Sequence, residues 1–123
     1  MSLLMTDILP PGSTIGILGG GQLGRMLSVA AARLGYKTHI YEPAANPPAG
    51  DVAHQVTTAS YEDHAALAGF ADQVDVITYE FENVPTAALD LLEARRPIRP
   101  NRRALAISQD RILEKDFLTG LGL

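Results

Sequence analysis

The feature that most constrains this chain is a glycine loop, Gly19 to Gly24, which lies between a predicted strand and a predicted helix. Before the loop, residues 15–18 (IGIL) form a short apolar run that is typical of a buried parallel strand. After the loop, apolar residues recur at helical spacing as far as Leu34, and Gly35 is placed to end the helix. This order predicts the first strand, loop and helix of a Rossmann-like α/β domain.

A glycine loop that opens a helix is a natural site for a phosphate group. The first N–H groups of a helix have no partner within it, and the helix dipole adds partial positive charge there. We assign Gly19 to the tight turn, Gly21 to close approach of the ligand and Gly24 to packing of the helix on the strand. The alternative is a purely structural turn.

The rest of the chain continues the alternation of strands and helices. Strands are predicted at residues 37–41, 52–59 and 74–79, with a very short fifth strand at Ile98. Helices are predicted at 61–71, where Ser60 would open a capping box, and from Pro85 onward, with further helical pieces after Asn101 and Ser108. Such alternation predicts an α/β fold, a mostly parallel sheet with helices on both faces.

Composition narrows the classes of ligand and partner. The 123 residues, 46% of them hydrophobic, suit one soluble domain, and the absence of cysteine excludes disulfides and thiolate chemistry. A net charge of −4 argues against a general nucleic-acid binder, and no apolar run is long enough to span a membrane. We expect a cytoplasmic protein with a small-molecule ligand, no nucleic-acid partner and no membrane contact.

The second predicted strand raises the possibility of a dinucleotide. Glu42 ends that strand, where dinucleotide-binding folds place the acid that holds the ribose hydroxyls. On the glycine loop and Glu42 alone, an NAD(P)-dependent oxidoreductase is a reasonable hypothesis.

Two acidic residues follow the fourth predicted strand, in the segment Tyr79 to Pro85. Ligands of open α/β sheets bind beyond the carboxyl ends of the strands, which would bring this segment beside the glycine loop. Glu80 or Glu82 is suited to accept hydrogen bonds from sugar hydroxyls or an amine, and the other to cap the next helix. The alternative is a solvated acidic loop.

Positive charge gathers toward the end of the chain. Arg111 falls in the first turn of a predicted helix, where a cation is electrostatically unfavourable, so we consider both an ATP phosphate and a salt bridge as its partner. Five arginines precede it, and they form either a solvated helix end or a surface that faces a polyanion: Arg95, Arg96, Arg99, Arg102 and Arg103. The three histidines have no carboxylates spaced to form a metal site.

Three segments together resemble one family. They are GGGQLGRM (19–26), YEFENVP (79–85) and QDRILEKDFL (109–118), in the order and spacing of the N5-carboxyaminoimidazole ribonucleotide synthetases. The resemblance implies an ATP-grasp ligase of de novo purine biosynthesis, which uses ATP, bicarbonate and Mg²⁺ to carboxylate the amine of 5-aminoimidazole ribonucleotide. The family is typically homodimeric, and this chain would be its pre-ATP-grasp domain.

The resemblance also implies roles for particular residues. Gly21, Gln22 and Leu23 would contact the ribonucleotide through the loop, Glu80 would bind its ribose, and Arg111 would reach ATP. No catalytic or metal-binding residue is expected in these 123 residues, because the family's Mg²⁺ and bicarbonate sites lie in the ATP-grasp domain.

The expected domain organisation has two parts. Residues 1–14 would be an N-terminal extension, with 1–3 interpreted as an expression remnant, and residues 15–123 the substrate-binding domain. We expect the ATP-grasp and C-terminal domains to be absent from this chain, and the fragment alone to be inactive. The alternatives are a glycinamide ribonucleotide enzyme, which Gln22 disfavours, the NAD(P)-binding domain above, and a non-catalytic nucleotide-sensing module.

Overall fold

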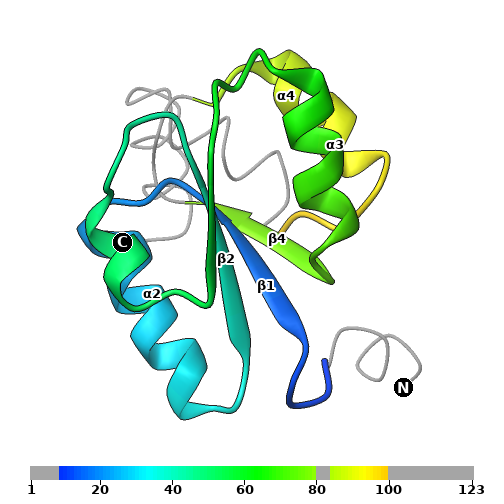
Figure 1. Ribbon diagram of the computed structural model, residues 1–123. Coiled ribbons are helices and arrows are strands. Elements are labelled where there is room, and N and C mark those ends of the chain that lie inside the picture. Colours follow the sequence, from blue (N-terminus) through cyan, green and yellow to red (C-terminus); the bar gives the residue numbers. More distant parts are fainter. Residues whose placement is uncertain (1–8, 80–83, 100–123) are drawn as a thin grey trace, which may run out of the picture.

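A parallel sheet forms the centre of the computed structural model of the chain, which describes residues 9–79 and 84–99 (Figure 1). The strand order is β3-β2-β1-β4, and all three pairings are parallel. An isolated parallel bridge between Ile77 and Ile98 confirms the short fifth strand beside β4. The strands are β1 (Thr14–Leu18), β2 (Lys37–Glu42), β3 (Gln55–Thr58) and β4 (Val76–Tyr79).

Helices cover both faces of this sheet, as predicted. Helix α2 (Gln22–Arg33) lies on one face with the short 3₁₀ helix η1 (Pro48–Asp51), while α3 (His64–Asp72) and α4 (Thr86–Glu93) lie on the other (Figure 1). Consecutive strand residues point to opposite faces. Ile17 therefore packs in the cluster on the α2 side, and Leu18 packs in the larger cluster beneath α3 and α4.

Gly16, in the middle of β1, lets α3 approach the sheet closely. A Cβ atom at this position would lie 2.7 Å from Cζ of Phe70 and 3.1 Å from both methyl groups of Val74. Phe70 and Val74 are both buried and have little room to move, so a side chain at residue 16 would force α3 away from the sheet.

The end of α2 has the predicted glycine. Gly35 has a φ of +88°, a left-handed conformation that favours glycine. Beyond it, the Tyr36 N–H donates to the carbonyl of Ala31 at 2.9 Å, the long-range bond of a Schellman motif.

Two predicted boundaries were wrong. Helix α3 begins at His64 because Asp63 is its cap, accepting a hydrogen bond from the Ala66 N–H at 3.0 Å, whereas Ser60 Oγ accepts from the Glu62 N–H outside the helix. Strand β3 covers only Gln55–Thr58, because the N–H groups of Val52 and Ala53 turn back to the carbonyl of Ala49.

The outer face of α2 is more apolar than the spacing predicted. Leu23, Met26 and Leu34 are 40%, 66% and 70% exposed, so they are not the core-facing stripe. The buried positions are instead small, at Gly24, Ser28 and Ala31, and small residues allow the helix axis to lie close to the sheet. None of the described helices combines the length and the apolar character that a membrane span requires. The helical pieces predicted after Asn101 and Ser108 lie outside the described residues.

His39 is part of the core. It is 1% exposed, its Nε2 lies 2.7 Å from Oγ1 of Thr57, and its ring packs edge-on against Phe70. Burial, with a smaller contribution from His54, lowers the pKa of His39 from 6.5 to about 4.

We predict that His39 makes the fold sensitive to acid. Its folded pKa lies below its unfolded value, so between pH 6.5 and 4 the unfolded chain binds more protons and the free energy of unfolding falls as the pH falls. Replacing His39 by Gln should reduce the difference in unfolding free energy between pH 7 and pH 4.5 by about 2 kcal/mol. Urea denaturation at both pH values measures this difference.

The exposed His64 provides the control. His64→Gln should retain the full pH dependence of the original chain. An unchanged pH dependence in His39→Gln would show that the buried imidazole is not the acid-sensitive group.

Candidate ligand-binding site

The glycine loop joins β1 to α2 at the carboxyl end of the sheet. Gly19 has a φ of +107°, so the chain leaves β1 through a left-handed turn that glycine adopts without strain. Gly21 is the N-cap of α2, and no side chain caps this helix end. The helix therefore begins at Gln22 with its first N–H groups directed beyond the strand ends.

The N–H groups of this loop fall into two sets. Those of Gly19 and Gly20 are bonded within the domain, to the carbonyl of Tyr41 at 2.9 Å and to Oε1 of Glu42 at 2.8 Å. Those of Gly21, Gln22 and Leu23 have no acceptor in the part of the chain that the structure describes. Three consecutive unpaired N–H groups at a helix N-terminus provide donors and positive potential for one anion.

A neighbouring segment packs on the first half of the loop. A Cβ atom at Gly20 would lie 2.6 Å from Cβ of Pro47, and the Ala49 N–H donates to the carbonyl of Gly20 at 2.9 Å. The segment that follows β2 and includes η1 thus packs on Gly20. These contacts do not involve Gly21 or Gln22, where α2 begins.

Glu42 is turned toward the glycine loop. Its Oε1 accepts the Gly20 N–H at 2.8 Å and its Oε2 accepts the Ala44 N–H at 2.9 Å. The end of β2 therefore carries the acid that a dinucleotide site would need, but that acid bonds to the protein backbone.

The strand that precedes Glu80 lies beside the loop. Tyr79, the last residue of β4, pairs with Leu18, the last residue of β1, so both strands end at the same level of the sheet. From β1 the chain adds β2 and then β3 on one side, and it then crosses the sheet to add β4 on the other side of β1. The boundary between β1 and β4 is therefore a topological switch point. Glu80 and Arg111 themselves lie outside the described residues.

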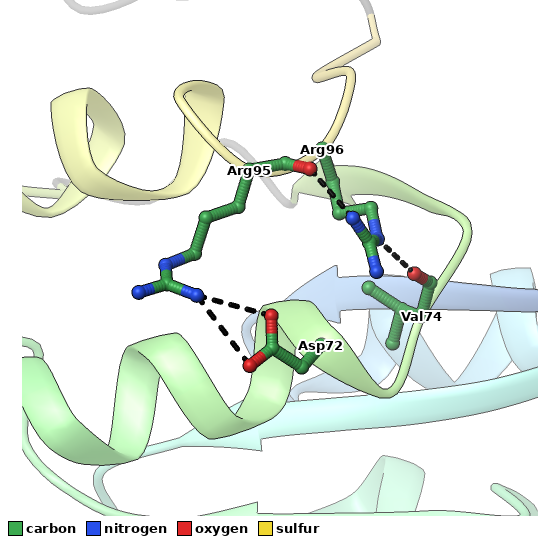
Figure 2. Close-up of polar contacts among 4 residues, drawn as sticks. All are labelled: Asp72, Val74, Arg95 and Arg96. Carbon is green, nitrogen blue, oxygen red and sulfur yellow. Dashed lines mark hydrogen bonds and ion pairs between the residues drawn. The ribbon is translucent and has the colours of Figure 1, made fainter.

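Arg95 and Arg96 bond to residues at the other end of the sheet. Figure 2 shows Arg95 at Asp72 of α3, with Nη1–Oδ1 at 3.1 Å, and Arg96 donating from Nε to the carbonyl of Val74 at 2.7 Å. Val74 precedes β4, so these contacts lie at the amino ends of the strands, away from the glycine loop. They favour the helix-end interpretation for Arg95 and Arg96, while Arg102 and Arg103 lie outside the described residues.

Sequence reasoning missed the segment that supports the loop. Pro47 and Ala49 hold it from the side through Gly20, whereas Asp51 of the same segment makes an exposed ion pair with Arg25 of α2, at 3.5 Å, and not with the loop. The one available signal was Gly20, the middle glycine of the run 19–21, whose packing against Pro47 explains why a side chain is not tolerated there. Within residues 9–79 and 84–99, no three His, Asp or Glu side chains gather to form a metal site.

The model of one protein family matches residues 12–109, and its description is "Ribonucleotide synthetase preATP-grasp domain". An N5-carboxyaminoimidazole ribonucleotide synthase from Brucella melitensis biotype 1 is 57% identical over 115 residues, which are 94% of this chain and 32% of that protein.

Solved structures of the same kind of enzyme are also similar to this chain. The ADP complex of an N5-carboxyaminoimidazole ribonucleotide synthetase matches with a TM-score of 0.84 and 43% identity, over 97% of this chain and 32% of that one. The Aspergillus clavatus synthase, solved with ADP and 5-aminoimidazole ribonucleotide, matches with a TM-score of 0.74 and 33% identity, over 91% and 30% of the two chains. This chain thus spans about a third of the length of these relatives.

We predict that Gly20→Ala destabilises the loop. The added methyl group would overlap Pro47, and overpacking of this kind costs about 1–3 kcal/mol. Urea denaturation should show this loss in the free energy of unfolding.

Gly69 is the matched control. It lies within α3, a Cβ atom there would meet nothing within 4 Å, and alanine favours the helix, so Gly69→Ala should stabilise the chain by about 0.5–1 kcal/mol. Equal stability of the two variants would contradict the close packing at Gly20.

Proposed function

The chain belongs to the ribonucleotide synthetase pre-ATP-grasp family, and on this basis we propose that it is the substrate-binding domain of an ATP-dependent ligase. The proposed enzyme carboxylates 5-aminoimidazole ribonucleotide to N5-carboxyaminoimidazole ribonucleotide in purine biosynthesis. Relatives named for this product, of which the chain covers about a third, support the assignment.

The observation that carries the proposal is the set of N–H groups at Gly21, Gln22 and Leu23, for which the described part of the chain supplies no acceptor. Their number and direction suit the 5′-phosphate of a ribonucleotide, which would sit at the positive end of α2. The neighbouring β4 end, at Tyr79, would direct the ribose toward Glu80. A nucleotide monophosphate needs one such anion site, whereas a dinucleotide also needs room and an acid for a second ribose.

The proposed chemistry takes place beyond this domain. A bicarbonate oxygen attacks the γ-phosphorus of ATP and ADP leaves, which gives carboxyphosphate. The amine nitrogen of the ribonucleotide then bonds to the carboxyl carbon, with loss of phosphate and a proton. This domain would hold the ribonucleotide so that its amine faces that carbon, a contribution of position rather than of acid–base chemistry.

ATP and Mg²⁺ would be bound mainly by the ATP-grasp part of the enzyme, where the metal neutralises phosphate charge. No described residue of this chain is assigned to the metal. Arg111 would reach the ATP phosphates from this domain, and a cytoplasmic homodimer is the proposed state of the whole enzyme.

Titration of the intact protein tests the proposed substrate. We expect saturable heat of binding with 5-aminoimidazole ribonucleotide and none with NADH, because Pro47 packs against Gly20 and Glu42, the acid that would bind a dinucleotide ribose, accepts the Gly20 N–H. Tight binding of NADH with no response to the ribonucleotide would refute the ligase assignment.

Steady-state kinetics test Arg111. Arg111→Ala should raise the KM for ATP about tenfold, as expected for loss of one charged phosphate contact, and leave ribonucleotide affinity nearly unchanged. The control is Arg95→Ala, because Arg95 pairs with Asp72 near the amino ends of the strands, away from the glycine loop. A loss of ribonucleotide affinity with normal ATP kinetics would contradict the role of Arg111.

A further inference from the structure

The carboxylate of Glu42 makes one hydrogen bond to a residue distant in sequence and one to a residue that follows it closely. One oxygen accepts the Gly20 N–H at 2.8 Å, and the other accepts the Ala44 N–H at 2.9 Å. The side chain thereby links the end of β2 to the glycine loop and to the segment that follows β2. Hydrogen bonds to an ionised carboxylate are shorter and stronger than those between neutral groups.

The same peptide group is held from its other side. The carbonyl of Gly20 accepts the Ala49 N–H at 2.9 Å, while Pro47 packs where a Gly20 side chain would be. Both polar groups of Gly20 are thus bonded, one to Glu42 and one to the segment that carries Pro47. The position of Gly20 in turn sets the position of Gly21, the N-cap of α2.

These contacts decide which donors a ligand can reach. Glu42 accepts the Gly20 N–H and the carbonyl of Tyr41 accepts the Gly19 N–H, so within the described residues the donors left in this part of the loop are those of Gly21, Gln22 and Leu23. In dinucleotide sites the acid at the end of the second strand accepts from ribose hydroxyls. Here both carboxylate oxygens accept backbone N–H groups, and Pro47 packs against Gly20.

We propose that Glu42 is a positioning and specificity-determining residue. It holds the glycine loop so that three N–H groups can donate to a single phosphomonoester. Because its carboxylate is bonded to the backbone, it does not bind the ribose hydroxyls of a dinucleotide. The identity of the phosphomonoester as a ribonucleotide rests on the proposed function.

Kinetics of the intact protein test this role. Glu42→Ala should raise the KM for 5-aminoimidazole ribonucleotide at least about tenfold, the effect expected when a charge-assisted hydrogen bond is lost, and leave the KM for ATP within about twofold. Glu42→Gln keeps an acceptor oxygen for the Gly20 N–H but presents an NH₂ group to Ala44, so it should show a smaller, still selective increase.

Asp51→Asn is the matched control. It removes a carboxylate from the same segment, but Asp51 is exposed and contacts only Arg25 among the described residues, at 3.5 Å. The ribonucleotide KM of this variant should stay within about twofold of the original value.

The outcomes separate the two proposals. Ribonucleotide KM values of Glu42→Ala and Glu42→Gln that match the original protein, in an enzyme that is active, would refute the role of Glu42 alone. An equal rise of both KM values would also refute it, because the effect would then not be selective for the ribonucleotide. Should Glu42→Ala not fold, the isosteric Gln variant decides by the same criterion. If the protein without substitutions neither binds nor carboxylates the ribonucleotide, the proposed function is refuted instead.

Discussion

The pairing of β1 with a parallel neighbour on each side is the constraint on which the rest of the domain depends. Its residues are bonded to β2 and to β4, and its two faces are buried by α2 and by α3 with α4. Only small or apolar side chains fit this environment, and at Gly16 even a methyl group would overlap Phe70. Because β1 cannot shift, the loop that leaves it has a fixed origin, and so does the positive end of α2.

The two ends of the sheet differ in which polar groups they present. At the amino ends of the strands, Arg95 and Arg96 bond to Asp72 and Val74 and join α4 to α3 (Figure 2). At the carboxyl ends, the N–H groups of Gly21, Gln22 and Leu23 have no partner among residues 9–79 and 84–99. Charge used for stability is thus kept apart from the donors proposed for the ligand.

Much of the fold could be predicted from the sequence because its signals are local. The apolar run before the glycines, Gly35 after α2 and the alternation of elements depend on neighbouring residues, and the structure confirms them. The start of α3 was harder, because Ser60 and Asp63 are both good caps and only the hydrogen bond to Ala66 distinguishes them. The orientation of Glu42 could not be predicted, since its partner Gly20 is 22 residues away and its choice depends on packing of the Pro47 segment. The assignments of Glu80 and Arg111 stay predictions.

The bonded loop has a consequence for the thermodynamics of recognition. Gly19, Gly20 and Gly21 each make a backbone hydrogen bond that is present before any ligand arrives: to Tyr41, to Glu42 and Ala49, and to Arg25. A flexible glycine-rich segment would lose conformational entropy on closing around an anion, and that loss would weaken binding. Here the entropy is lost when the chain folds, so the loop is preorganised. Such a site favours a ligand of matching shape over one that requires the loop to rearrange.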